Sequence, residues 1–332
     1  MNHDHTRTDN DRLPVVPFDP ELERVYAAMP ADLLRDLTRD DIPWLRRSDP
    51  PSDEAADIAA RHRTPHQRQE VEHDGVVTSV DVYGAGGAGR PGIFTIHGGG
   101  LIAGTALSGL DELLPMAAEL DAVVFSTSYR LAPEHPAPAA RDDALAALAW
   151  CLENAESFGV GPGRMLLRGV SAGGGLAASV AVAARDRGLP ATAGLMLEAP
   201  MLDDRNETAS AKQYAGRHPW NRGSNAMGWE AYLGRMSDAA RDELVPARVG
   251  DLGGLPPVYL DVGSAEVFRD EVVAFASRLW RAGGEAELHV WNGGFHGFAP
   301  SAPESRLSAT VRTAREGWIA RLFARTAEAP SA

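Results

Sequence analysis

The sequence predicts an α/β fold in which a mostly parallel sheet is covered by helices on both faces. Two patterns lead to this prediction: short apolar segments that read as buried strands, and amphipathic helical segments that alternate with them along the 332-residue chain. In addition, 44% of the residues are apolar, which is enough for one large core. We therefore expect one α/β domain accompanied by smaller helical segments.

The predicted strands begin with an antiparallel hairpin. Asp74 and Gly75 form a strong turn signal between two segments of alternating polarity, at 67–73 and 76–83. Six apolar strands follow, at residues 92–97, 122–128, 164–170, 193–199, 257–263 and 286–291. Helical spacing of apolar residues predicts helices between and after them, at about 139–152, 268–282 and 307–322.

Two segments do not follow this alternation. Residues 1–66 are expected to form a disordered tail, over 1–14, and then a helical cap segment whose short helices are interrupted by prolines. Within the α/β domain at 67–332, residues from about 201 to 254 contain no clear strand and read as an insertion. Ligands bind at the carboxyl ends of strands in open α/β sheets, so both segments are expected to roof such a site.

Three aromatic side chains near the middle of the insertion have two open interpretations. They could line a ligand pocket, or they could pack the insertion against the core, and the sequence favours neither interpretation. These residues are Trp220, Trp229 and Tyr232.

Charge, cysteine content and hydropathy narrow the expected partners, disulfide chemistry and location of the protein. A formal net charge of −14 disfavours a nucleic-acid backbone or an anionic membrane surface. The single cysteine, Cys151, cannot form an intramolecular disulfide and is expected to be a small core residue. The polar N-terminus lacks the apolar segment of a secretory signal, and no apolar run approaches the roughly 18 residues that span a bilayer. We expect a soluble, cytoplasmic protein.

A glycine-rich segment at 84–89 fits the G-x-G-x-x-G pattern but does not predict a cofactor site. A dinucleotide-binding fingerprint must open a helix, whereas here Arg90 and Pro91 lead directly into another predicted strand. Without a helix N-terminus there is no place for a pyrophosphate, so we expect a flexible loop. The sequence contains no motif that indicates a metal or a cofactor.

Ser171 stands between two glycines where a predicted strand gives way to a helix, in the segment Gly169-Val170-Ser171-Ala172-Gly173. Such a sharp turn requires strained backbone angles, and the glycines leave room for the crowded backbone. The hydroxyl would then lie exposed over a helix N-terminus, which favours negative charge. The pentapeptide is weak evidence alone, but its position between strand and helix favours a nucleophilic serine.

Three consecutive glycines follow the strand at 92–97, in the segment His97-Gly98-Gly99-Gly100. Glycine amides can point into a cavity without obstruction by a Cβ atom, which is what an oxyanion hole requires. We expect the amides of Gly98, Gly99 and Ala172 to form this hole. His97 is expected to brace the loop rather than take part in the chemistry.

A serine hydroxyl needs a base, and in this kind of fold the order along the chain is serine, acid, histidine. Only His218, His289 and His296 follow Ser171. His289 lies inside a predicted strand, and His218 lies in the insertion. His296 lies in a glycine-flanked loop after the last strand, where an imidazole can reach over the sheet edge, so we expect His296 to be the base.

The acid should leave the strand at 257–263, so that it approaches the imidazole from below. Asp261 lies inside this strand, whereas Glu266 lies in the loop directly after it. Asp270 and Glu271 open the next helix, where acids are favoured by the helix dipole alone. Position favours Glu266, and Asp270 stays open as the alternative.

Together these motifs resemble the bacterial hormone-sensitive-lipase-type esterases and lipases of the α/β-hydrolase superfamily. The resemblance runs from about Gly92 to the C-terminus, and the motifs that carry it are HGGG at 97–100, YRLAPEHPAP at 129–138, GVSAGG at 169–174 and GGFHGF at 293–298. The family's usual acid lies in an Asp-Pro-Leu-x-Asp-Glu box, which here reads Glu-Val-Phe-Arg-Asp-Glu at 266–271. A glutamate stands here in place of the aspartate, and the proline is absent.

The resemblance implies an α/β-hydrolase fold with a helical cap, and a serine carboxylic-ester hydrolase that needs no cofactor. It implies a Ser171-Glu266-His296 triad that forms an acyl-enzyme with small, short-acyl esters, and members of this family often form homodimers. An amidase or deacetylase of an acylated metabolite could use the same triad. A non-catalytic ligand-binding protein of this fold is a further alternative, although such proteins typically lose the histidine. In the YRLAPE motif, Arg130 and Glu134 are expected to tie a turn together.

Overall fold

The computed structural model describes residues 13–216 and 218–328, and it contains all eight predicted strands in one sheet. They are β1 (His66–His73), β2 (Val76–Tyr83), β3 (Arg90–Ile96), β4 (Val123–Thr127), β5 (Val160–Val170), β6 (Gly194–Glu198), β7 (Val258–Gly263) and β8 (Ala286–Trp291). β5 begins earlier than predicted, because Val160 pairs with Arg90 before an irregularity in the register. Most of the tail predicted at 1–14 lies outside the described residues.

The strand order across the sheet is β1-β2-β4-β3-β5-β6-β7-β8. β1 and β2 form the predicted antiparallel hairpin, β2 pairs with β4 in antiparallel orientation, and every other pairing is parallel. The mostly parallel sheet is therefore confirmed. Since the carboxyl ends of parallel strands meet at one edge, the segments that follow β3, β5, β7 and β8 come together there.

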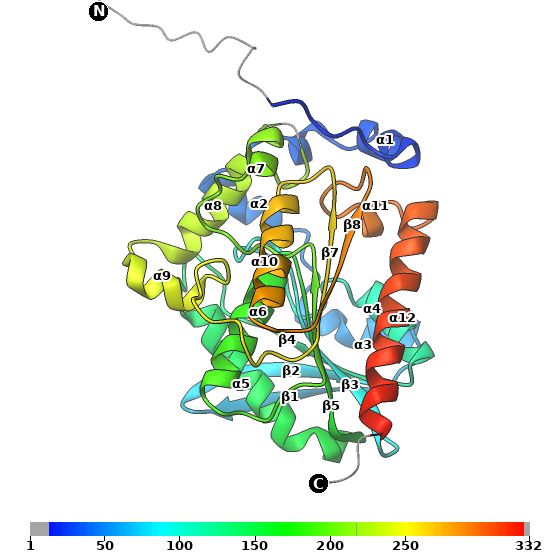
Figure 1. The fold of residues 1–332 in the computed structure, drawn as a ribbon. Helices are drawn as coiled ribbons and strands as arrows, with labels where there is room; N and C mark the ends of the chain where they lie inside the picture. Colours follow the sequence, from blue (N-terminus) through cyan, green and yellow to red (C-terminus); the bar gives the residue numbers. More distant parts are fainter. Residues whose placement is uncertain (1–12, 217, 329–332) are drawn as a thin grey trace, which may run out of the picture.

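Helices cover both faces of the sheet (Figure 1). One face carries α5 (Ala139–Asn154), η5 (Ala155–Phe158), α6 (Ala172–Asp186) and α10 (Arg269–Arg281); the other carries α3 (Ala55–Arg61), α4 (Leu110–Glu119) and α12 (Arg306–Glu328). The three predicted helices are confirmed as α5, α10 and α12. α4, which contains Pro115, was not predicted from the sequence. In the described part of the chain no helix is both long and apolar enough to cross a membrane.

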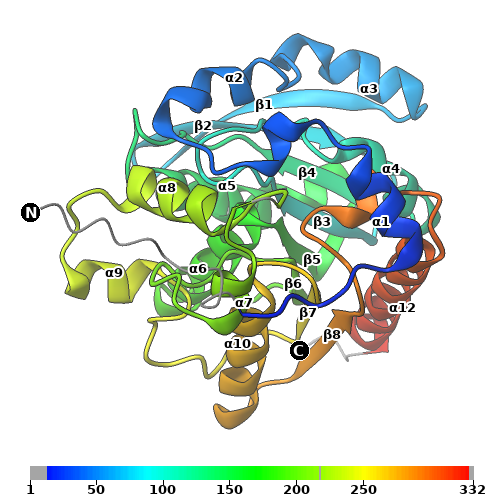
Figure 2. The ribbon, with the colours of Figure 1, turned by 90° about the horizontal axis from the view of Figure 1, so that it is seen from above.

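Apart from α11 (Phe298–Ser301), which follows the loop of His296, the remaining helices in the described residues belong to the two segments that were expected to form a roof. The N-terminal segment holds α1 (Pro20–Ala27), η2 (Ala31–Leu34), η3 (Arg39–Asp41), α2 (Ile42–Arg46) and η4 (Ser52–Glu54). The insertion holds α7 (Ala209–Gln213), α8 (Arg222–Leu233) and α9 (Asp238–Leu244), without a strand among its described residues. In the view from above, α1, α2, α7 and α8 lie over the sheet (Figure 2). Leu37 donates its amide to Ser224 Oγ at 3.0 Å, which joins the two segments.

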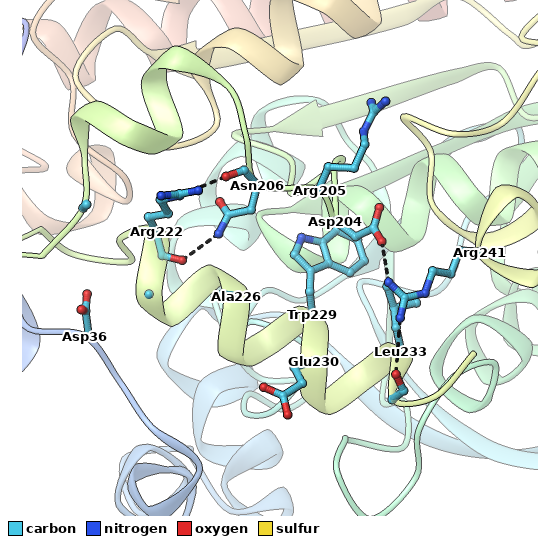
Figure 3. A pocket seen from close by; sticks show the side chains of 13 residues that line it. Asp36, Asp204, Arg205, Asn206, Arg222, Ala226, Trp229, Glu230, Leu233 and Arg241 are labelled. Atoms are coloured by element: carbon cyan, nitrogen blue, oxygen red, sulfur yellow. Dashed lines mark hydrogen bonds and ion pairs between the residues drawn. The ribbon is translucent and has the colours of Figure 1, made fainter. Parts of the chain in front are cut away.

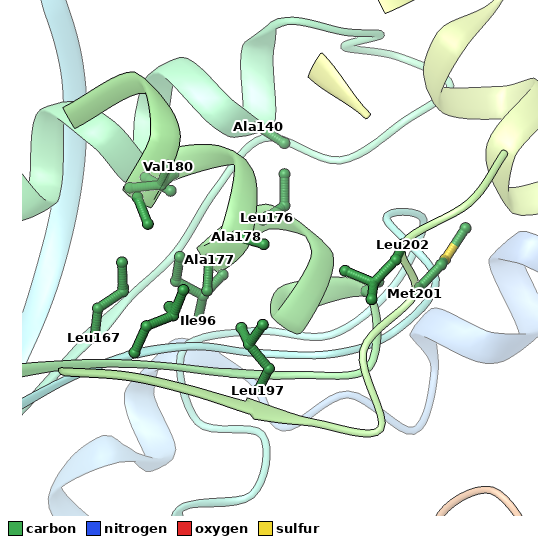
Figure 4. Close-up of a cluster of buried hydrophobic side chains, with 14 of the residues drawn as sticks. Ile96, Ala140, Leu167, Leu176, Ala177, Ala178, Val180, Leu197, Met201 and Leu202 are labelled. Atoms are coloured by element: carbon green, nitrogen blue, oxygen red, sulfur yellow. The ribbon is translucent and has the colours of Figure 1, made fainter. Parts of the chain in front are cut away.

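The largest core lies between the sheet and the α5, α6 and α10 layer, and Cys151 is buried in it as expected. Figure 4 shows part of this core, where Ile96, Leu167 and Leu197 of β3, β5 and β6 lie below α6. Ala177 of α6 lies close to Ile96, whereas Leu176 lies on the other side of the helix, toward Ala140 of α5. Small residues let α6 approach the sheet closely. A Cβ atom at Gly169 would collide with the Gly173 carbonyl and lie 2.8 Å from Ala177 Cβ, so this contact fixes the helix directly behind Ser171.

The glycine-rich segment at 84–89 is a loop that leads from β2 into β3, as predicted. Arg90 Nη1 donates to the Gly84 carbonyl at 2.5 Å and to the Gly86 carbonyl at 2.8 Å, which ties the loop down. Because a strand and not a helix follows, the segment has no helix N-terminus to offer a phosphate.

Candidate active site

Ser171 occupies the turn between β5 and α6 in a strained conformation. Its φ of 55° and ψ of −120° lie in a region that residues with a side chain rarely adopt. Two hydrogen bonds hold this backbone: the Ser171 amide donates to the Glu198 carbonyl at 2.8 Å, and the Met201 amide donates to the Ser171 carbonyl at 3.0 Å. The neighbouring strand and the segment after it therefore stabilise the strained turn.

The glycines on either side of Ser171 are required by close backbone approach. A Cβ atom at Gly173 would collide with the carbonyls of Ile96 and His97 at the end of β3. The collision at Gly169 described above involves the Gly173 carbonyl itself. The G-x-S-x-G pattern thus reflects a helix that begins in contact with two strand ends.

A chain of hydrogen bonds joins Ser171, His296 and Glu266. Ser171 Oγ lies 3.0 Å from His296 Nε2, and His296 Nδ1 lies 3.1 Å from Glu266 Oε1. The second carboxylate oxygen of Glu266 accepts from the Gly263 amide at 3.2 Å, and the residue is only 2% exposed. A neutral His296 that donates from Nδ1 to Glu266 has Nε2 free to accept the serine proton.

The other candidate acids have different partners. Asp270 Oδ2 accepts from the Ser210 amide at 2.8 Å, which ties α10 to the insertion. Asp261 accepts two hydrogen bonds from Arg315, at 2.7 and 2.9 Å. Glu271 Oε1 accepts from the amides of Leu202 and Asp203, at 2.7 and 3.2 Å. Of the four acids considered, the structure therefore brings Glu266 to His296, and the other three have different partners.

The two alternative histidines also lie in other surroundings. His218 packs edge-on against Tyr214, with ring centroids 4.8 Å apart, and burial lowers its pKa to about 4. His289 stacks on Trp291 at 4.9 Å and forms a hydrogen bond of 2.9 Å with Glu287. Only His296 of these three is hydrogen-bonded to Ser171 among the described residues.

The three glycines after β3 form a tight loop beside Ser171. Gly99 and Gly100 have φ values of 109° and 64°, and a Cβ atom at Gly99 would collide with the Ala103 carbonyl. A Cβ atom at Gly98 would lie 3.3 Å from Ser171 Cβ, so this part of the loop lies against the serine. Within residues 13–216 and 218–328, the amides of Gly98 and Gly99 donate to no backbone carbonyl. Ala172 opens α6, where amides have no acceptor within the helix.

His97 braces this loop, as expected. Its Nδ1 lies 2.8 Å from the Gly98 carbonyl, and its ring stacks on Tyr129 with centroids 4.2 Å apart. Tyr129 in turn donates its hydroxyl to the His97 carbonyl at 3.0 Å. Burial lowers the pKa of His97 to about 4, so the ring is neutral near pH 7.

Ser171 opens into a cavity of about 510 Å³. The N-terminal segment lines it with Leu45, Ser48 and Asp49, and the insertion lines it with Trp220. Of the three aromatic residues with open interpretations, Trp220 is thus the one that lines this cavity. Trp229 and Tyr232 are 5% and 3% exposed, and both belong to the core cluster.

A second cavity of about 530 Å³ lies beside α8, with Asp36 of the N-terminal segment at its border (Figure 3). Its polar side chains are largely engaged with one another. Asp204 pairs with Arg241 at 3.1 Å and with Arg248 at 2.5 Å. Arg222 Nε donates to the Asn206 carbonyl at 3.0 Å, and the buried ring of Trp229 forms part of the wall.

The YRLAPE motif differs from the prediction. Arg130 does not pair with Glu134 but with Asp143 of α5, at 2.7 Å. Glu134 pairs instead with Arg46 of α2, at 2.8 Å. The expected tie within the turn is wrong because tertiary packing brings each residue a partner from another element. The available signal in the sequence was Asp143, which stands among the apolar residues of 139–152. In the structure its side chain is 1% exposed and therefore needs a partner.

A buried ion-pair network that lines part of the cavity was not predicted. Arg168 Nε lies 2.5 Å from Glu198 Oε1, and Arg315 Nη1 of α12 lies 2.6 Å from Glu198 Oε2. Arg315 also binds Asp261, as described above. Charged residues inside otherwise apolar strands were the available signal, since buried charges need partners. Among the described residues, no group of three or more His, Cys, Asp or Glu is arranged to hold a metal ion.

Comparison with known proteins identifies the family and the fold. The family model described as the α/β-hydrolase fold matches residues 93–300. The esterase LipI of Mycobacterium tuberculosis is 31% identical over 242 residues, which cover 66% of this chain and 70% of LipI. A solved bacterial heroin esterase is 33% identical with a TM-score of 0.81, covering 92% of this chain and 98% of the other. The solved structure of esterase LipW from Mycobacterium marinum is 32% identical with a TM-score of 0.82, and the match covers 93% of this chain and 98% of LipW.

Proposed function

The chain belongs to the α/β-hydrolase family, and on this premise we propose that it is a serine carboxylesterase that hydrolyses small, short-acyl esters through an acyl-enzyme on Ser171. One observation carries the proposal: hydrogen bonds of 3.0 and 3.1 Å connect Ser171 through His296 to the buried Glu266, and Ser171 opens into a cavity. The resemblance to hormone-sensitive-lipase-type esterases and the similarity to named esterases support the same class of reaction.

In the first half of the reaction, Ser171 Oγ attacks the ester carbonyl while His296 Nε2 takes the hydroxyl proton. The carbonyl oxygen becomes negative, and the amides of Gly98, Gly99 and Ala172 donate hydrogen bonds to it. Glu266 holds the imidazole in the required tautomer and stabilises the imidazolium. The tetrahedral intermediate then collapses: the C–O bond to the alcohol breaks, and His296 gives its proton to the leaving oxygen.

In the second half, water takes the place of the alcohol. His296 removes a proton from the water molecule as it attacks the acyl carbonyl, and the same three amides stabilise the second oxyanion. Collapse releases the carboxylic acid and returns the proton to Ser171 Oγ. The sequence of steps consumes one ester and one water, and it needs no cofactor.

We attribute the proposed preference for small esters to one wall of the cavity. Its volume of about 510 Å³ is limited by Trp220, whose ring lies so close to Gly100 that a Cβ atom there would collide with it. We assign the N-terminal segment before residue 67 and the insertion at about 201–254 to a cap over the catalytic domain at 67–332. In this assignment the cap limits the length of the acyl group that can reach Ser171.

The test is hydrolysis of p-nitrophenyl esters from acetate to laurate by the wild type, Ser171→Ala and Ser179→Ala. Ser179 is buried in the same helix and serves as the matched control. We expect activity that peaks at short acyl chains, is lost in Ser171→Ala and is retained in Ser179→Ala. Full activity of Ser171→Ala would contradict the proposal. A matched amide, p-nitroacetanilide, tests the amidase alternative, which predicts that the amide is cleaved at least as well as the acetate ester.

A further inference from the structure

The proposed reaction requires fixed amides at Gly98 and Gly99, but the loop that carries them has few restraints of its own. We call residues 97–104 the oxyanion loop. Its internal backbone hydrogen bonds run from the amides of Ile102 and Ala103 to the Gly99 carbonyl, at 3.1 and 3.0 Å. Glycines in left-handed conformations gain no rigidity from a side chain. Contacts from outside the loop must therefore hold it in place.

Arg46, the last residue of α2, contacts the loop from the N-terminal segment. Its Nε donates to the Ile102 carbonyl at 2.7 Å, and its Nη2 donates to the Ala132 carbonyl at 2.8 Å. Both terminal nitrogens also bind the Glu134 carboxylate, each at 2.8 Å. The planar guanidinium thus uses all three nitrogens to join α2, the oxyanion loop and the YRLAPE motif.

Further contacts reinforce this arrangement on the same flank. The Gly104 amide, at the end of the oxyanion loop, donates to Asp49 Oδ2 at 2.8 Å. The Ala132 amide donates to the Leu101 carbonyl at 3.0 Å. The YRLAPE motif, which Arg46 contacts, is therefore itself hydrogen-bonded to the oxyanion loop. At its start the loop is also held by Tyr129, whose hydroxyl donates to the His97 carbonyl. The N-terminal segment and the YRLAPE motif therefore both restrain the loop from outside.

We propose that Arg46 is a positioning residue: it fixes the oxyanion loop, and with it the amides of Gly98 and Gly99, without touching the substrate. The N-terminal segment is then part of the catalytic apparatus and not only a roof over the cavity. This inference rests on the proposed function, because it assigns a role in the same reaction. It also gives the YRLAPE motif a function, because the Glu134 carboxylate orients the Arg46 guanidinium and the Ala132 carbonyl accepts a hydrogen bond from it.

The main test compares Arg46→Met, which keeps an unbranched side chain but loses the hydrogen bonds, with Arg39→Met. Arg39 lies in the same segment but pairs with Glu230 of α8, at 3.4 Å, so it serves as the matched control. The kcat and KM for p-nitrophenyl butyrate are measured per active site, after titration with a fluorophosphonate. Displacement of catalytic groups by about 1 Å costs roughly 100-fold in rate, so we expect kcat of Arg46→Met to fall about 10- to 100-fold. KM should change less than about threefold, because the loss is in the transition state.

A transition-state analogue separates positioning from general stability. A trifluoromethyl ketone forms a tetrahedral adduct with the serine, and its inhibition constant should rise in Arg46→Met by the same factor by which kcat falls. Arg39→Met should leave both values unchanged. The inference is overturned if kcat per titrated site in Arg46→Met equals that of the wild type, or if Arg39→Met loses as much as Arg46→Met.

Glu134→Gln provides a second variant if Arg46→Met does not fold. The Glu134 side chain is 56% exposed, so its substitution leaves the core intact. We expect a smaller fall in kcat, and no additional fall when it is combined with Arg46→Met, because both act through one contact. Fully additive losses, or an unchanged kcat in Glu134→Gln alone, would overturn the role of Arg46. A wild-type chain that cleaves no ester would instead overturn the proposed function, and this inference with it.

Discussion

Two cavities of similar volume border the insertion, about 510 and 530 Å³, but their polar groups are arranged differently. In the first, Ser171 is hydrogen-bonded to His296, and Gly98 of the oxyanion loop lies against the serine. In the second, charged side chains such as Asp204 and Arg241 bind each other (Figure 3). Volume alone therefore does not identify a reactive site. What distinguishes the first cavity is hydrogen-bonding capacity that stays available for a substrate.

The largest effect should come from replacing His296, the proposed general base in the first cavity. We expect His296→Gln to lower kcat/KM for p-nitrophenyl acetate by about 10⁴-fold, because loss of a triad member leaves only binding and oxyanion stabilisation. His289→Gln should stay within about threefold of the wild type, since His289 bonds to Glu287 on β8. Equal losses in the two variants would show that the distinction between these histidines is wrong.

The second-largest loss of activity should come from replacing Glu266, the proposed acid of the triad. Glu266→Gln keeps the shape of the side chain but cannot stabilise the imidazolium, so kcat should fall by about 10³- to 10⁴-fold. Asp270→Asn should lower kcat by less than about tenfold, because Asp270 bonds to Ser210 and not to His296. Steady-state kinetics on a short-chain ester checks both. The reverse ranking would assign the acid to Asp270.

Substitutions of Trp220 and Trp229 test whether the first cavity, and not the second, determines which acyl chains are hydrolysed. Trp220→Ala removes the wall beside Gly100, so the ratio of octanoate to acetate hydrolysis should rise about tenfold. Trp229→Phe changes only the second cavity, and we expect it to leave this ratio unchanged. Competition between the two p-nitrophenyl esters measures the ratio directly. A shift in Trp229→Phe would mean that the second cavity influences the substrate.

The smallest effect concerns stability and not activity. Burial lowers the pKa of His218 from its ordinary value of 6.5 to about 4, so between these pH values the unfolded chain binds a proton that the folded chain does not. The free energy of unfolding should therefore fall as the pH drops from 7 to 5. In His218→Phe, whose new ring keeps the contact with Tyr214, this fall should be smaller by about 1–2 kcal/mol. Urea unfolding at both pH values checks this, and identical pH dependence would contradict it.

Features with a strict local backbone requirement could be predicted from the sequence. Gly169 and Gly173 are required by collisions that any side chain would cause, and Gly99 by its positive φ, so these positions show in the sequence as motifs. Six strands were recognisable because their apolar segments differ from the helical segments between them, and the hairpin was recognisable from its turn at Asp74 and Gly75. The position of Glu266 followed in the same way, from the end of an apolar strand.

Contacts between distant elements left no such signal. Arg46 and Glu134 are 88 residues apart, and nothing in either segment indicates the other. Arg315 meets Glu198 of β6 and Asp261 of β7 only because α12 packs across these two strands. Likewise, the faces that Trp220 and Trp229 present depend on how the insertion packs. The homodimer and the cytoplasmic location remain predictions from the family resemblance and the composition.

The most direct test of the central claim, that Ser171 is the nucleophile of an esterase, is covalent labelling with diisopropyl fluorophosphate followed by peptide mass spectrometry. We predict one adduct, on Ser171, whose stoichiometry equals the fraction of ester hydrolysis lost. Ser171→Ala should take up no label. An adduct on another residue, or full activity of a completely labelled protein, would contradict the assignment.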